Sequence, residues 1–190
     1  MNNSEALEAL KILRFNLNNS ASPNMTRAIA NQASIAALVY GLAMIDAFAG
    51  FFYGVEAKKQ AKRGDGVGIR FDEFIRHYLA PARSGCDYSR LDFYKSMRCN
   101  MAHSLTPGHH KKGTFDFELR QDADSTHGTN KTARRIIFDV PTFCDDVLHA
   151  AAAFLNDVEL SFAQNPEPPI LQNFKGWWDE GYSILVSESE

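Results

Sequence analysis

Apolar positions recur mostly three and four residues apart along this chain, which is the spacing of an amphipathic α-helix. Where it ends, Pro or Gly usually follows, as at Pro81, Pro107 and Gly108. The pattern predicts helices over residues 4–18, 25–63, 71–79, 88–105, 142–164 and 170–184. Ser4 and Thr142 are the expected N-caps of the first and fifth of these helices.

Between residues 114 and 140 the period changes from helical spacing to alternation. Phe115, Phe117 and Leu119 alternate with polar residues, and so do Ile136 and Phe138. We therefore expect two short strands, 114–120 and 134–140, that form a β-hairpin around a polar, mobile loop. The predicted fold class is all-α: a helical bundle of about five to six helices with a small β-hairpin insertion near 114–140.

Length and composition favour a single folded domain over residues 1–190. The chain of 190 residues is 45% hydrophobic and carries a formal net charge of −3, so no global positive charge is present to attract nucleic acid. The three cysteines lack disulfide or metal-type spacing, and we expect three free thiols. No signal peptide is visible at the start, and the expected location is the cytoplasm.

Two apolar or glycine-rich segments suggest other functions that the sequence argues against. Residues 33–55 are long and apolar enough to span a bilayer, but Asp46 lies in their middle, so we expect a buried central helix and no membrane association. The Gly64-Asp65-Gly66-Val67-Gly68 stretch lacks the Gly-Lys-Ser/Thr of a phosphate-binding loop and is expected to be a flexible linker.

One stretch speaks to chemistry: Arg98-Cys99-Asn100-Met101-Ala102-His103, near the end of the predicted helix 88–105. Proton transfer near neutral pH needs a titratable group, and the stabilisation of a developing anion needs a fixed cation. Histidine, with a reference pKa of about 6.5, suits the first role, and arginine suits the second. Arg98 and His103 supply both residue types.

This Arg-x4-His arrangement resembles the signature of the HEPN superfamily, whose domains are all-helical and commonly dimeric and include many metal-independent RNases. The resemblance implies that Arg98 stabilises charge and that His103 is the general acid or base. The position after the arginine is often polar in that family but is Cys99 here. Either Asn100, one place later, is the polar helper, or the helper is absent. The resemblance also implies a homodimer, RNA as substrate, no cofactor and no metal. A cognate antitoxin, or a nucleotidyltransferase-like protein, is the further partner it implies.

Helix geometry sets a condition on this hypothesis. Five residues along an α-helix correspond to about 7.5 Å and about 140° of rotation, so Arg98 and His103 would not share a face of a regular helix. The family's solution is a dimer that brings two motifs to one cleft. The simpler alternative is that both residues stabilise the helix C-terminus, where cations are favoured.

Further residues could support such a site. Two roles are open for Asp46. In the first, it contacts Arg98 or His103 from behind the site and orients it. In the second, it is a buried carboxylate that is hydrogen-bonded to a helix end or to a tyrosine. The run His109, His110, Lys111 and Lys112 could hold an RNA backbone, although a solvated loop is the simpler interpretation. His127 and His149 have no ligand-type partners at suitable spacing and are assigned no metal role.

Two functions remain open on the sequence. The first is a homodimeric, metal-independent endoribonuclease, as in toxin–antitoxin or defence systems. The second is a non-catalytic helical module for dimerisation or for RNA or nucleotide binding, in which Arg98 and His103 hold a phosphate without cleaving it.

Overall fold

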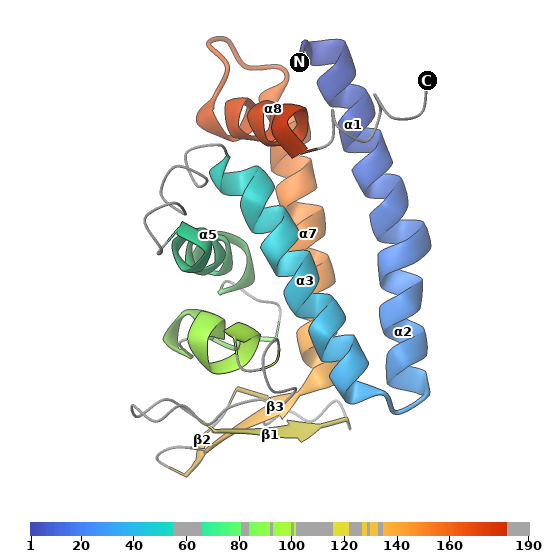
Figure 1. Cartoon of the computed structure of the whole chain (residues 1–190), viewed down its shortest axis with the longest axis vertical. Coiled ribbons are helices and arrows are strands. Elements are labelled where there is room, and N and C mark those ends of the chain that lie inside the picture. Colours follow the sequence, from blue (N-terminus) through green and yellow to red (C-terminus); the bar gives the residue numbers. More distant parts are fainter. Residues whose placement is uncertain are drawn as a thin grey trace.

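The computed structural model describes most of the chain, and the fold is mostly helical with a small sheet (Figure 1). The described residues are 1–54, 66–80, 84–91, 93–99, 101, 116–121, 127–128, 130–132 and 135–181. This architecture confirms the predicted fold class, a helical bundle with a small β insertion between residues 114 and 140.

The N-terminal part forms one long arm that the periodicity only partly predicted. Helix α1 (Asn3–Asn16) is capped by Asn2, whose side chain forms a capping box with that of Glu5. The prediction of Ser4 as the N-cap is therefore wrong. A π-helical turn, η1 (Leu17–Ala21), leads directly into α2 (Ser22–Ala30). Pro23 does not interrupt the arm, because it lies in the first turn of α2, where its missing N–H is not needed.

The predicted helix 25–63 is wrong as a single element. The chain turns at Asn31–Ala33, where Gln32 has a φ of 57°, and α3 (Ser34–Tyr53) follows. Gly54, with a φ of 73°, ends α3, a conformation that glycine adopts without strain. Apolar periodicity alone could not show these breaks, because a three-residue turn and a single glycine do not interrupt it. Residues 55–63 of the prediction lie outside the described residues.

Helix α5 (Gly66–Phe74) continues into a second π-helical turn, η2 (Ile75–Leu79). The apolar face predicted for 71–79 is confirmed, with Phe71, Phe74, Ile75 and Leu79 buried. The linker expected at 64–68 is wrong for Gly66–Gly68, which belong to α5. Gly68 lies in close contact with the ring of Tyr94, which belongs to a helical segment further along the chain.

The helix predicted over 88–105 is not continuous in its described part. A 3₁₀ turn, η3 (Tyr88–Arg90), comes first, and the helical residues after it include Phe93, the π-helix η4 (Tyr94–Cys99) and Met101. Of the apolar residues in this segment, Leu91, Met97 and Met101 are buried. Residues 102–105 of this prediction lie outside the described residues.

The insertion between residues 114 and 140 is a sheet, but its pairing differs from the predicted hairpin. Strand β1 (Asp116–Arg120) runs parallel to β3 (Arg135–Asp139), and the short β2 (Asn130–Thr132) lies antiparallel on the other side of β3. Parallel pairing requires a connection of about a dozen residues or more, and residues 121–134 provide that length. Alternation identified both strands, but it carries no information about strand direction.

Strand β3 leads directly into α7 (Val140–Ser161), which is capped by the Asp139 carboxylate and not by Thr142. The last described helix is α8 (Pro169–Gly181), and the predicted residues 182–184 lie outside the described range.

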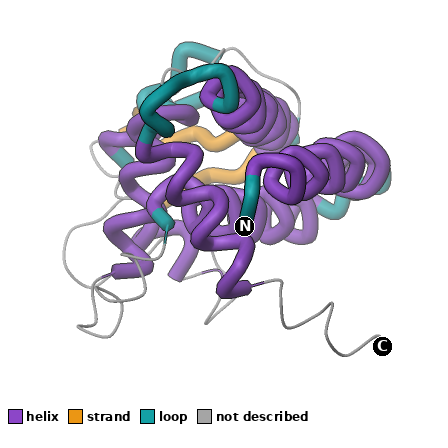
Figure 2. Tube along the Cα trace, turned by 90° about the horizontal axis from the view of Figure 1, so that it is seen from above, coloured by secondary structure: helices purple, strands orange, loops and turns teal. Residues whose placement is uncertain are grey.

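Helices α3 and α7 form the centre of the bundle. Helix α3 packs against α2, α5, α7 and α8, and α1 packs against α7 (Figure 1). The sheet lies beyond one end of these helices (Figure 1), and in the view along the bundle its strands overlap the helices (Figure 2). Because α3 contacts elements on most sides, any polar group on it meets partners from distant parts of the sequence.

Helix α3 is long and apolar enough to cross a membrane, and 56% of its apolar stretch is buried inside the protein. The core helix of a soluble protein can have the same length and composition. One side of α3 remains exposed, and every residue on it is apolar. We call this surface the α3 stripe: Ile35, Ala36, Val39, Tyr40, Ala43 and Ala47.

Candidate functional site

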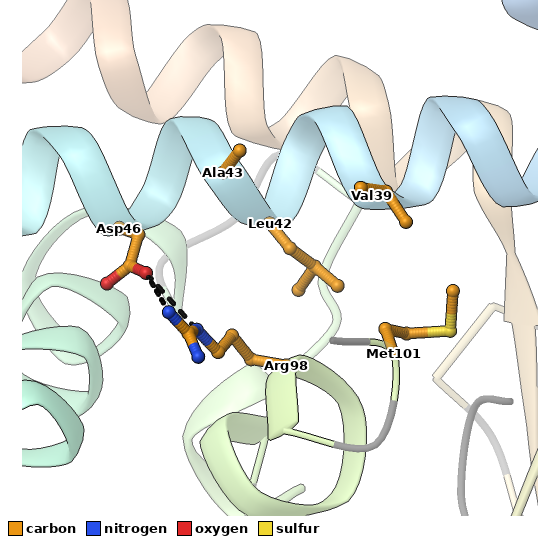
Figure 3. Close-up of a pocket in the computed structure, with 6 residues that line it drawn as sticks. All are labelled: Val39, Leu42, Ala43, Asp46, Arg98 and Met101. Carbon is orange, nitrogen blue, oxygen red and sulfur yellow. Dashed lines mark hydrogen bonds and ion pairs between the residues drawn. The ribbon is translucent and has the colours of Figure 1, made fainter. Parts of the chain in front are cut away.

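Asp46 and Arg98 form an ion pair with two hydrogen bonds between α3 and η4. The Nε and Nη2 atoms of Arg98 donate to one carboxylate oxygen of Asp46, at 3.1 Å and 2.7 Å (Figure 3). Arg98 is also held from its own helix, because its guanidinium lies 5.8 Å from the centre of the Tyr94 ring. The guanidinium therefore has a fixed orientation. The contact between Asp46 and Arg98 agrees with the first of the two roles that the sequence suggested for Asp46, which is to orient Arg98 or His103.

A second arginine that the sequence did not single out completes this cluster. Arg70 of α5 donates from Nη2 to the other oxygen of Asp46, at 3.3 Å. Its guanidinium lies 5.0 Å from the ring of Trp177 in α8, and that ring packs against the backbone of α3 at Gly50, where a Cβ atom would lie 2.5 Å from it. A side chain at Gly50 would therefore displace the ring that supports Arg70.

The cluster of Arg70, Asp46 and Arg98 has a net charge of +1, since two guanidiniums share one carboxylate. Partial burial works to lower the pKa of Arg98, but the hydrogen bonds and charge of Asp46 outweigh it and raise that pKa above its ordinary value. The side chain of Arg98 is still 31% exposed. Arg98 is therefore a permanent, oriented cation that an anion from solvent can reach.

Beside this ion pair lies a pocket of about 170 Å³. Figure 3 shows Asp46 and Arg98 at one end of it and Val39 and Met101 at the other. The described residues that line it are Val39, Leu42, Ala43, Asp46, Arg98 and Met101. Apart from the ion pair, these walls are entirely apolar.

The α3 stripe continues from this pocket as a wider and shallower hollow. The hollow, of about 770 Å³, runs along α3 from Gln32 to Ala43 and shares Val39 and Ala43 with the pocket. Val39 is 40% exposed and Ile35 is 38% exposed. Apolar surface thus extends from the start of α3 to the ion pair.

The other residues expected to act with Arg98 lie outside the described residues. These are Asn100, His103, His109, His110, Lys111 and Lys112. Their roles stay predictions. Within the described part of the chain, no group of three or more His, Cys, Asp and Glu side chains could hold a metal ion.

The signal for Arg70 was present in the sequence but was hidden by the linker interpretation of 64–68. Once Gly66–Gly68 are helical, Arg70 lies on the first turns of α5, which packs against α3. A buried aspartate on an apolar helix needs a cation, and Arg70 was a candidate that neither spacing nor motif could select.

His127 differs from its expected place in a mobile loop, because it is buried against Phe138. The backbone N–H of Asp139 donates to its Nδ1 at 2.9 Å, so the ring proton must lie on Nε2, which bonds the Tyr88 hydroxyl at 2.7 Å. Tyr88 in turn donates to Asp146 at 2.7 Å. Burial lowers the pKa of His127, against the opposing charges of Asp146 and Asp139.

The predicted free thiols are confirmed, since Cys86, Cys99 and Cys144 form no disulfide. Burial raises the pKa of Cys86 and of Cys144 to about 12, and neighbouring aspartates add to the effect. These two thiols are therefore protonated at neutral pH and unsuited to act as nucleophiles.

Comparison of the chain with protein-family models, with curated proteins and with solved structures finds no match.

Proposed function

We propose that this protein is a metal-independent endoribonuclease that uses Arg98 and His103. The observation that supports it most is the position of Arg98: an oriented, solvent-accessible guanidinium at the end of an apolar pocket. A guanidinium fixed in advance binds a phosphodiester and its pentavalent transition state without first losing side-chain freedom. His103, five residues later, would move the proton of the 2′-hydroxyl.

Arg98 lies in the π-helix η4 (Tyr94–Cys99), so its own turn is not that of a regular α-helix. The offset of about 140° derived from the sequence holds only for a regular α-helix. Single π-helical turns also occur often at functional sites.

We further propose that the active form is a homodimer that pairs through the α3 stripe. A helix that is apolar on all sides is normally covered on all sides, yet this stripe is exposed in the single chain. In a two-fold interface the same patch of both subunits is in contact, so a charged residue near the axis would lie close to its own copy. The α3 stripe has no charged residue and avoids this repulsion. Since the pocket shares Val39 and Ala43 with this surface, pairing would bring two copies of Arg98 near one cleft.

The test is cleavage of total RNA by purified protein in EDTA. We expect Arg98→Ala and His103→Ala each to lower the rate by about 100-fold or more, the usual scale for losing such a group. Matched controls are Arg90→Ala and His149→Ala, which remove an exposed arginine and an exposed histidine outside the pocket. The controls should cut like the wild type.

Equal cutting by all five proteins would contradict the proposal and point to a contaminating nuclease. Sedimentation at matched concentration would show whether the wild type is a dimer. It would also show whether Arg98→Ala or His103→Ala lost activity because the dimer dissociated.

A non-catalytic module that binds RNA or a nucleotide is the second candidate. The ion pair with Asp46 favours it, because the carboxylate already neutralises part of the charge that a transition state would use. In that case RNA binding would be measurable and would depend on Arg98, while no protein in the series would cut.

A further inference from the structure

The pocket beside Arg98 has a size and lining that limit what can occupy it. At about 170 Å³ it would hold about half a dozen water molecules at roughly 30 Å³ each, and it is smaller than the roughly 300 Å³ at which pockets for drug-sized ligands begin. It therefore admits one small group, such as a single ring system, and not a whole extended ligand.

The walls favour a flat apolar face. Val39, Leu42 and Ala43 lie on one side of α3, three and four residues apart, and present aliphatic side chains. Met101 contributes a polarizable thioether from the opposite side, a group that contacts aromatic rings favourably and adapts to their shape (Figure 3).

The polar end of the pocket adds a requirement for negative charge next to that flat group. Arg98 uses Nε and Nη2 for Asp46, and Nη1 takes no part in these bonds. The cluster with Arg70 keeps a charge of +1, so an anion at this end is attracted. A nucleotide combines the two features, since its base is flat and its phosphate is anionic.

We propose that this pocket is a nucleobase subsite, which holds the base that flanks the phosphate bound by Arg98. The proposal rests on the proposed function and adds the part of the substrate that the site holds. No polar atom lines the pocket apart from those of the ion pair, within the described residues. The subsite therefore selects a base by stacking and size, and not by reading its hydrogen-bonding edge.

The methionine methyl groups provide a direct readout. A base stacked in the pocket shifts the NMR resonance of the Met101 methyl group through its ring current, whereas Met25 on α2, which does not line the pocket, serves as an internal reference. The probes are adenosine 5′-monophosphate and ribose 5-phosphate, titrated into the full chain with ¹³C-methyl-labelled methionine. The adenosine nucleotide should move Met101 and leave Met25 in place, and ribose 5-phosphate should move neither.

Two matched variants separate the subsite from the rest of the surface. Ala43→Leu fills the pocket, while Ala153→Leu makes the same change at an exposed position of α7, outside both the pocket and the α3 stripe. We expect the first to weaken adenosine monophosphate binding at least tenfold and the second less than twofold. Sedimentation of both variants checks that the oligomeric state is matched.

An unmoved Met101, an equal response to ribose 5-phosphate, or unchanged binding by Ala43→Leu would each overturn the subsite. Cleavage that depends on Arg98 and His103 could still hold in those cases, so the proposed function would stand. A shifted Met101 without any cleavage would support the subsite and contradict the nuclease.

Discussion

Asp46 and Asp146 are two carboxylates at the centre of polar clusters, but their partners differ in charge. Asp46 on α3 is shared by two arginines, is partly exposed, and lies beside a pocket. Asp146 on α7 is buried and accepts hydrogen bonds from the hydroxyl groups of Tyr88 and Ser84, which are neutral. Tyr88 connects it further to His127.

The difference separates a site that can take a ligand from a network that holds the fold together. In the Asp146 network each donor points to an acceptor, from the Asp139 backbone through His127 and Tyr88 to the carboxylate, and it joins the β3–α7 junction to the turn at Tyr88. Around Asp46, a net positive charge and accessible guanidinium atoms remain. We therefore expect changes at Asp146 to act on stability, and changes at Asp46 to act on binding.

Asp146→Ala should have the largest effect on folding. The change leaves the hydroxyl of Tyr88, which is fully buried, without its acceptor, and a hydrogen bond to a charged group contributes about 1.5–3 kcal/mol. We expect the free energy of unfolding to fall by about 3 kcal/mol, measured by urea denaturation. Asp145→Ala, the exposed neighbour on the same helix, should change it by about 0.5 kcal/mol or less. Equal losses from both variants would contradict a special role for the network.

Acid should weaken the same network through His127. Its folded-state pKa is lowered by burial, so below about 6.5 the unfolded chain binds a proton that the folded chain does not. Stability therefore rises with pH through the window between the lowered pKa and about 6.5, and it falls as the solution is acidified. Protonation would also place an N–H at Nδ1, opposite the N–H of Asp139.

The measurement is urea denaturation of the wild type and His127→Gln between pH 5 and 7.5. One proton corresponds to a slope of at most about 1.4 kcal/mol per pH unit, and the wild type should be steeper than the variant by up to that amount. Parallel curves would mean that His127 does not titrate differently on folding. His77 and His149 are present in both proteins and cancel in the comparison.

The contrast between these regions also shows what the sequence could predict. Periodicity found most helices and both longer strands, because burying one face leaves a repeat in the sequence. The sequence also singled out Asp46 and Arg98, since a charge on an apolar helix and an arginine in a motif are unusual. The sequence did not indicate Arg70 or the Asp146 network, whose members come from segments far apart in the chain.

Two further errors have local physical causes. The π-helical turns at 17–21, 75–79 and 94–99 keep an apolar face much as an α-helix does, so no residue type marks them. The placement of His127 was wrong because its surroundings in sequence are polar, while its burial depends on Phe138 and Tyr88.

Asp46→Asn should cost much less stability than Asp146→Ala. Asp46 and the two arginines around it, Arg70 and Arg98, are partly exposed, and solvent screens such pairs to about 0–1 kcal/mol. We expect a decrease of about 1 kcal/mol or less in the free energy of unfolding, and less still in 1 M salt. A loss as large as that of Asp146→Ala would mean that the cluster is a structural centre and not a binding site.

The same substitution should strengthen the binding of single-stranded RNA. Without its carboxylate the cluster has two guanidiniums and a charge of +2 in place of +1, and a unit charge about 4 Å away is worth about 1 kcal/mol in water, or roughly fivefold in affinity. Anisotropy with a labelled oligoribonucleotide would measure this in a His103→Ala background, where cutting does not interfere.

The salt dependence of this binding would test whether the gain arises at the Asp46 cluster. If Asp46→Asn frees Arg70 or Arg98 for one more phosphate, the plot of log affinity against log salt should steepen by about 0.7. Asp157→Asn, which removes an exposed carboxylate on α7 that bonds Tyr78, changes the net charge equally but should leave the slope unchanged. A rise in affinity that both variants share would reflect overall charge alone. A rise confined to Asp46→Asn would mean that the carboxylate competes with phosphate for Arg98, so that Asp46 both orients this arginine and limits its affinity.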